Sequence, residues 1–179
     1  MATENFGWLM EMKLLLSNNN EKYTGVQDIF NFLELDINKD IINEYFSILN
    51  NDGGIPFSKY SLSVLKKMET EITECGASVT ILALAESSES QPDSFHFLGF
   101  DVSGDSFFHS PLFRTFFETP ESTYFNAIRE RFSKHLNKKG LFSDISIATE
   151  FTQYIRENNS ENVFESDGNI RPIAIYSIT

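Results

Sequence analysis

The stretch from Phe95 to Phe117, FHFLGFDVSGDSFFHSPLFRTFF, is the sequence feature that most limits how this chain folds. It begins with residues that alternate as in a β-strand and then breaks at a turn-forming run, Ser103-Gly104-Asp105-Ser106. Six large apolar residues, five of them phenylalanine, follow the turn, which is more than an ordinary loop carries. Because exposed aromatic surface is unfavourable in water, we expect this stretch to be buried in a core or covered by another surface.

The sequence before residue 76 predicts helices. Apolar residues recur at helical spacing in four ranges, which are residues 5–16, 24–33, 38–49 and 56–75. The first of these is compatible with a strand as well, but the spacing of Trp8, Leu9 and Met12 favours a helix. Gly76 is a residue type that ends helices. We therefore expect residues 1–76 to form a helical subdomain.

The pattern changes after residue 76. Residues 78–84 are apolar and rich in β-branched side chains, so they predict a buried strand that pairs with the strand beginning at Phe95. Residues 170–178 predict a last strand, and Pro172 places its start at a sheet edge or a strand entrance.

Two helices are expected between these strands. The first has Thr119 as its N-cap and Pro120 in its first turn, and Ser143 or Asp144 caps the second. The order β-β-α-α-β predicts an α+β fold, with helices packed on one face of a small antiparallel sheet. Residues 77–179 would form this subdomain and pack with residues 1–76 as one domain.

The amount and position of negative charge limit which kinds of partner this chain can bind. The 179 residues carry a formal net charge of −12. Between Glu71 and Glu118 there are eight acidic residues and one basic residue, Arg114, so the acidity is concentrated around the phenylalanine-rich stretch. Negative charge repels phosphate backbones, so we expect no nucleic-acid partner and favour a basic protein partner. The alternative interpretation is that the negative charge only keeps the protein soluble.

The sequence gives little support for a disulfide-bonded, secreted or membrane-spanning protein. Cys75 is the only cysteine, which excludes an intramolecular disulfide and suits a reducing cytosol. The apolar run near the N-terminus is interrupted by Glu11 and Lys13, so we expect neither a signal peptide nor a membrane span.

Catalytic and metal-binding signatures are weak. Asp101, Asp105 and His109 follow one another at intervals of four and could bind a divalent metal or form an acid–base pair. Such residues are more often turn formers and a rim histidine. A basic run that includes Lys134, Lys138 and Lys139 could contact an anion, although it is more often a solvated helix face. We expect no enzyme activity, no cofactor and no bound metal.

Three short motifs resemble a known family. They are FLGFDV at residues 97–102, a serine-containing loop at Ser110-Pro111-Leu112, and the LN..GLF segment at residues 136–142. Together they are similar to bacterial immunity proteins that are encoded beside contact-dependent growth-inhibition (CDI) or polymorphic toxins. The resemblance covers about residues 95–179 and leaves the first half of the chain unexplained.

The resemblance implies a toxin–antitoxin function in the bacterial cytoplasm, in which the chain binds and neutralises a cognate toxin. Many such toxins are nucleases with basic clefts, which an acidic surface complements. Aromatic anchors within a charged rim would supply the binding energy. We predict that the partner-binding residues are Glu86, Glu89, Asp93, Asp101, Asp105, Phe107, Phe108 and His109.

Two other functions stay open. The chain could be an acidic inhibitor or adaptor of another basic protein, or a small metal-dependent hydrolase that uses Asp101, Asp105 and His109. The sequence does not decide between a monomer and a homodimer.

Overall fold

The computed structural model describes residues 9–16, 66, 69–70, 73–74, 79–85, 95–104, 110–118, 122–159, 164 and 169–178. The chain divides into two compact units. The first joins residues 1–20, 29–97 and 176–179, and the second joins residues 21–28 and 98–175. The boundary predicted after residue 76 stays a prediction, because most of residues 1–76 lie outside the described part of the chain.

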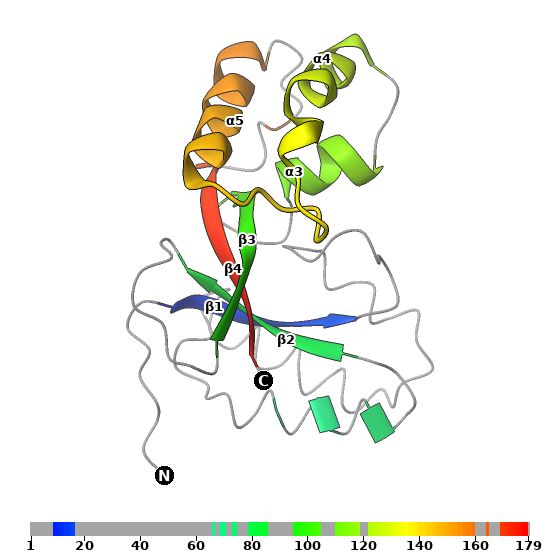
Figure 1. Cartoon of the computed structure of the whole chain (residues 1–179), viewed down its shortest axis with the longest axis vertical. Coiled ribbons are helices and arrows are strands. Elements are labelled where there is room, and N and C mark those ends of the chain that lie inside the picture. The colour runs from blue at the N-terminus through cyan, green and yellow to red at the C-terminus, as the bar shows by residue number, and fades with distance from the viewer. Residues whose placement is uncertain are drawn as a thin grey trace. The chain divides into compact units, whose positions relative to one another are not determined.

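The first unit contains two paired strands, β1 (Leu9–Leu16) and β2 (Val79–Ala85), which are antiparallel (Figure 1). The register runs from Leu9 opposite Ala85 to Leu16 opposite Val79, with one irregularity near Glu11. Residues 82–85 are buried in succession, as in a strand covered on both faces. The strand predicted over residues 78–84 is therefore confirmed.

The helix predicted over residues 5–16 is wrong. Residues 9–16 form a strand because their backbone groups pair with β2, about seventy residues later in the chain. The alternation of Glu11 and Lys13 with Met10, Met12 and Leu14 has the period of two that a strand requires. Farther along, Lys66, Glu69, Thr70, Thr73 and Glu74 are helical, in agreement with the helix predicted over residues 56–75.

Two more strands, β3 (Phe95–Ser103) and β4 (Arg171–Ile178), complete a four-stranded sheet with the order β1-β2-β4-β3. The predicted direct pairing of β2 with β3 is wrong, because β4 lies between them. Pro172 is the second residue of β4, so it stands at a strand entrance, and β4 itself is an interior strand. Residues 173–176 are completely buried, which suits the interior position.

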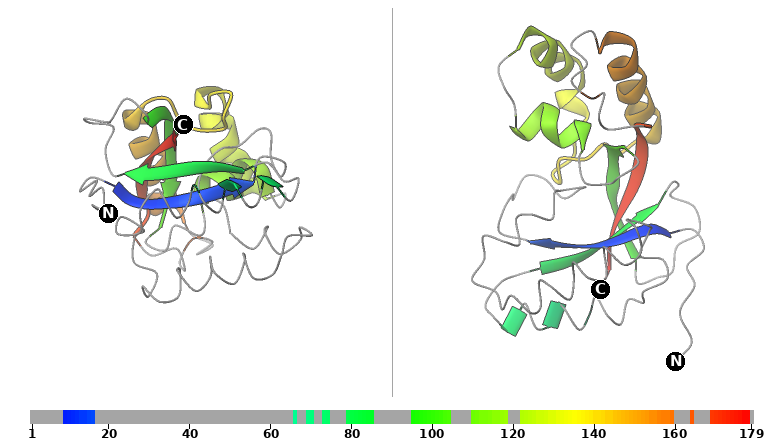
Figure 2. Two further views of the ribbon diagram at one scale, coloured as in Figure 1. Left: turned by 90° about the horizontal axis from the view of Figure 1, so that it is seen from below. Right: turned by 180° about the vertical axis from the view of Figure 1, so that it is seen from behind.

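The second unit contains helices α3, α4 and α5. The short helix α3 (Pro111–Phe113) continues into the π-helical turn η3 (Arg114–Glu118). Helix α4 (Thr123–Phe132) continues into the 3-10 turn η4 (Ser133–His135), and α5 (Ile145–Asn158) follows. Helices α4 and α5 lie side by side in both directions of view (Figures 1 and 2). The described chain is therefore a mixed α/β structure, which bears out the predicted fold class in its coarse form.

An aromatic cluster joins α4 and α5 in the core of the second unit. The ring of Phe132 lies 5.3 Å from that of Phe151 and 6.3 Å from that of Phe142, both nearly edge to face. All three side chains are buried. The phenylalanine-rich stretch adds Phe116, whose ring lies 6.2 Å from Phe151. Phe116 is half-buried and Leu112 completely buried, so this part of the stretch partly enters the core, whereas Phe97 is exposed.

The helix starts are set by local hydrogen bonds. The side chain of Asp144 accepts from the backbone N–H of Ser146, which confirms one of the two caps predicted for α5. This backbone hydrogen bond is the main reason that the pKa of Asp144 lies below its usual value. The cap predicted for α4 is wrong: Ser122 caps the helix through the N–H of Phe125 at 3.2 Å, and the helix begins later than Thr119.

Candidate functional site

Of the eight predicted partner-binding residues, Asp101 is the one that lies in the described part of the chain. Its side chain is completely buried. Its Oδ1 accepts hydrogen bonds from the backbone N–H of Val102 at 2.7 Å and from the hydroxyl of Ser110 at 2.5 Å. The predicted place of Asp101 on an exposed surface is therefore wrong. A buried carboxylate needs such partners because leaving it unpaired away from water is costly, so Asp101 acts within the fold.

Ser110 connects Asp101 to the start of α3. Its hydroxyl donates to Asp101 and accepts from the backbone N–H of Phe113 at 2.9 Å, as an N-cap does. Farther along, the carbonyl of Thr115 accepts from Nε of Arg129 at 2.8 Å. The serine-containing loop and FLGFDV, two of the three motifs of the family resemblance, thus meet at a buried polar contact.

The third motif meets the first at Asn137. The side-chain amide of Asn137 donates to the carbonyl of Leu98 at 2.8 Å, and its Oδ1 accepts from the backbone N–H of Lys139 and of Leu141. The backbone N–H of Asn137 donates to the carbonyl of Leu141 at 2.8 Å. We call residues 136–142 the Asn137 turn. Every polar group of Asn137 is used to hold the turn closed or to attach it to β3.

Gly99 allows the Asn137 turn to lie against β3. Its φ of 146° is a conformation that residues with a Cβ rarely adopt. A Cβ at this position would lie 2.7 Å from Cβ of Leu141 and 2.9 Å from the carbonyl oxygen of Phe142. The neighbouring Phe100 exchanges two backbone hydrogen bonds with Phe142, at 2.7 and 3.0 Å. The glycine of FLGFDV is thus required by the close approach of the LN..GLF segment.

The other predicted binding residues lie outside the described part of the chain. They are Glu86, Glu89, Asp93, Asp105, Phe107, Phe108 and His109. Their association in one surface therefore stays a prediction.

The predicted absence of a metal or catalytic centre also stays a prediction. Among the residues that the structure describes, no three His, Cys, Asp or Glu side chains are grouped as metal ligands would be. His96 and His135 are exposed, and Cys75 and His109 lie outside the described ranges. None of the described helices is long and apolar enough to cross a membrane.

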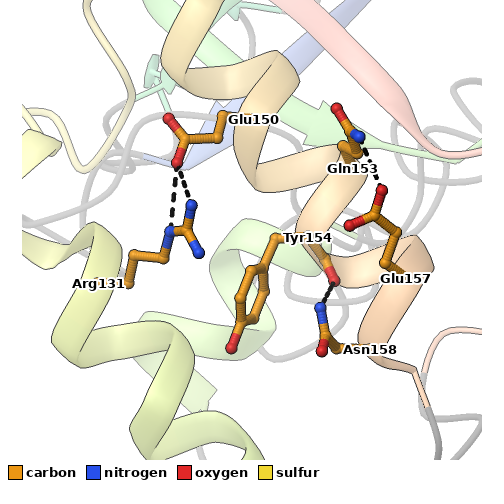
Figure 3. Close-up of polar contacts among 6 residues, drawn as sticks. All are labelled: Arg131, Glu150, Gln153, Tyr154, Glu157 and Asn158. Atoms are coloured by element: carbon orange, nitrogen blue, oxygen red, sulfur yellow. Dashed lines mark hydrogen bonds and ion pairs between the residues drawn. The ribbon is translucent and has the colours of Figure 1, made fainter.

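A charged and aromatic surface on α4 and α5 is the described region best suited to contact another molecule. Arg131 donates from Nε and Nη2 to Oε1 of Glu150, at 3.2 and 2.6 Å (Figure 3). Its guanidinium carbon lies 4.9 Å from the ring centre of Tyr154 and 5.3 Å from that of Phe132. The side chains of Arg131 and Glu150 remain about half exposed, at 51% and 47%. An ordered arginine beside a tyrosine is therefore presented on the surface.

Sequence reasoning did not find this surface. The basic run was interpreted as a solvated helix face, and no prediction placed the half-buried Tyr154 beside it. Arg131 and Tyr154 lie on different helices and are 23 positions apart in the chain, so no local spacing brings them together. The available signal was the charge imbalance of residues 129–139, which hold five Lys or Arg residues and one acidic residue, Glu130.

The chain matches no protein-family model, no curated protein and no solved structure. What can be inferred of its function therefore depends on its own residues and on the three motifs.

Proposed function

We propose that this chain is an immunity protein that binds a cognate toxin in the bacterial cytosol and neutralises it without catalysis. The toxin would be a basic domain of the nuclease type, and the chain would cover its active site or an essential surface. The proposal includes no cofactor, no metal, no nucleic-acid contact and no membrane contact.

The observation that carries the proposal is the distribution of negative charge. Eight acidic residues and one basic residue lie between Glu71 and Glu118, within a chain of net charge −12. A protein that blocks a nucleic-acid-binding cleft gains from negative potential, which speeds encounter with a basic surface and disfavours other partners. Phe107 and Phe108 lie within this acidic region and are the anchors that we propose.

The three motifs of the family resemblance are joined by hydrogen bonds. Asp101 of FLGFDV contacts Ser110 of the serine-containing loop, and Asn137 of the LN..GLF segment contacts Leu98 of FLGFDV. All three motifs therefore make hydrogen bonds at β3 and have a physical role in this chain's fold. That this fold is shared with the family stays part of the proposal.

The burial of Asp101 changes the proposed binding surface. A side chain with no exposed area does not contact a partner unless the fold opens. We therefore place the toxin-binding surface on Glu86, Glu89, Asp93, Asp105, Phe107, Phe108 and His109 and give Asp101 a role in folding.

The experiment pairs this chain with the toxin domain encoded beside its gene. Cells that express the toxin domain should survive when the chain is co-expressed, and calorimetry should give a one-to-one complex with a Kd near or below about 10 nM. Reversing the charge of Glu89, Asp93 and Asp105 together should weaken binding at least about a hundredfold. A matched control is the variant Glu130→Lys, Glu150→Lys, Glu157→Lys, which changes the net charge equally on described surface residues.

The outcomes separate the proposal from its alternatives. Equal loss of affinity in both triple variants would show that net charge, and not the acidic region, governs binding. Absence of growth protection and of a complex would overturn the immunity function. An acidic inhibitor of another basic protein is then the remaining interpretation. The hydrolase alternative would require Asp101 to act from its buried position, where its Oδ1 already accepts a hydrogen bond from Ser110.

A further inference from the structure

The segment from Arg131 to Lys139 carries charge of the opposite sign to the chain as a whole. We call it the cationic segment. It contains Arg131, Lys134, Lys138 and Lys139, all exposed, and no acidic residue. Arg131 pairs with Glu150 within the described part of the chain. The three lysines of the segment make no ion pair there, so their charge is open to another molecule.

The backbone that carries these cations is held in place. Lys138 and Lys139 lie in the Asn137 turn, where Oδ1 of Asn137 accepts from the N–H of Lys139 at 2.8 Å. The turn is attached to β3 through Leu98. Lys134 lies in η4, which continues α4 directly. Cations on a fixed backbone lose less conformational entropy when they bind than cations on a flexible loop.

Arg131 is ordered as well. Figure 3 shows its guanidinium between the carboxylate of Glu150 and the ring of Tyr154. The ion pair uses Nε and Nη2, and its two hydrogen bonds end on the same carboxylate oxygen, Oε1. Arginine and tyrosine are the residue types that most often dominate the energy of protein interfaces. The two side chains therefore form a prepared contact point at the start of the cationic segment.

We infer that the cationic segment, with Tyr154, is a docking surface for a carboxylate-rich stretch of a partner protein. A long nucleic acid is disfavoured because the net charge of −12 acts over its whole length. A short acidic stretch contacts the segment only locally. Salt largely screens it from the negative charges of this chain that lie more than about 10 Å away. The inference goes beyond the proposed toxin contact, since it requires a partner surface of the opposite charge and does not depend on any toxin.

A short, fluorescein-labelled poly-L-glutamate of about six residues is the probe for this surface, and fluorescence anisotropy at about 100 mM salt is the readout. The full chain should bind the probe, and the variant Lys134→Gln, Lys138→Gln, Lys139→Gln should bind at least about tenfold more weakly. The matched control is Thr70→Glu, Thr73→Glu, Thr149→Glu, which lowers the net charge by the same three units at exposed helix positions outside the segment. This control should keep the affinity within about twofold.

Tyr154 supplies a second readout. Tyr154→Ala removes the ring below Arg131 and should weaken probe binding about threefold, whereas Tyr154→Phe should not change it. Unchanged binding in Tyr154→Ala would overturn the part assigned to the tyrosine, because the lysines alone would then account for the affinity.

Each remaining outcome would overturn the inference. Absence of probe binding, or equal weakening in both triple variants, would leave the segment as an ordinary solvated surface. Tighter binding of a single-stranded DNA 20-mer than of poly-L-glutamate would assign the segment to nucleic acid. Self-association in sedimentation, lost in the glutamine variant, would assign it to a second copy of this chain. None of these results depends on the toxin experiment.

Discussion

The side-chain amide of Asn137 donates a hydrogen bond to the main-chain carbonyl of Leu98, 2.8 Å away and 39 residues earlier in the chain. This contact joins the Asn137 turn to β3 at the position before Gly99. It makes one asparagine responsible both for the shape of a turn and for its attachment to the sheet.

Replacing Asn137 by alanine should therefore destabilise the fold by about 2–3 kcal/mol, because several hydrogen bonds are lost together. Asn137→Asp is the matched control. It keeps the oxygen that accepts from Lys139 and Leu141 and replaces the donor to Leu98 by a carboxylate oxygen that repels the Leu98 carbonyl, so it should lose the attachment to β3 while the turn stays closed. Urea unfolding followed by circular dichroism measures both. A cost below about 0.5 kcal/mol for alanine would show that water replaces these contacts.

Gly99→Ala should destabilise by about 2–4 kcal/mol, because it adds backbone strain to a close contact. The φ of 146° disfavours any Cβ, and the new atom would lie 2.7 Å from Cβ of Leu141. Leu141→Ala does not remove that Cβ, so it should not rescue the variant. Rescue by Leu141→Gly would separate the steric cost from the backbone cost. Wild-type stability of Gly99→Ala in thermal unfolding would contradict the geometry of this contact.

Asp101 and Ser110 should behave as a pair of hydrogen-bonding partners. Ser110→Ala removes the donor to Asp101 and the acceptor for the N–H of Phe113, so we expect a loss of about 1–3 kcal/mol. Asp101→Asn keeps a carbonyl oxygen in the place of Oδ1 and should cost less than Asp101→Ala. If the two substitutions at Asp101 are equally harmful in urea unfolding, the charge, and not the acceptor, is what the site requires.

Two features that depend on residues close together in the sequence were predicted, whereas a strand that depends on distant pairing was not. The cap at Asp144 depends on Ser146, two residues away, and was predicted. The buried strand at residues 82–85 is visible as a continuous apolar run. By contrast, the helical spacing of Trp8, Leu9 and Met12 competed with pairing to β2, and the distant pairing decided the structure.

The same reason explains what was missed at the candidate sites. Asp101 reads as an exposed acid at the end of an aromatic strand, and its burial depends on contacts such as that with Ser110, nine residues later in the chain. The tyrosine beside Arg131 comes from another helix. The LN..GLF motif was noticed as a pattern, but its physical role required the contact between Asn137 and Leu98. Local patterns predicted the Asp144 cap and the strand at residues 79–85, whereas these sites depend on contacts between distant segments.

Asp144 should make stability depend on acidic pH. Its pKa in the folded chain is lowered, chiefly by the hydrogen bond from the backbone of Ser146. A lowered pKa means that the stabilisation is fully present above the unfolded value of 3.8 and is lost as the pH falls through the lower folded value. Asp144→Ser keeps a capping oxygen without a charge, so its stability should fall less steeply between about pH 4 and pH 2. Parallel curves of stability against pH for the two proteins would contradict this assignment.

Ionisation of Tyr176 should lower the stability of the fold at alkaline pH. Its side chain is completely buried in β4, with its ring 5.5 Å from that of Phe97, and burial raises its pKa from 10.0 to about 12. Because the folded value is the higher one, the neutral phenol stabilises the fold fully below pH 10, and this contribution is lost as the pH rises toward 12. Tyr176→Phe cannot ionise. Its free energy of unfolding should therefore decline less than that of the wild type between about pH 9.5 and pH 11.5 in urea titrations. Identical declines would mean that ionisation of Tyr176 is not coupled to unfolding.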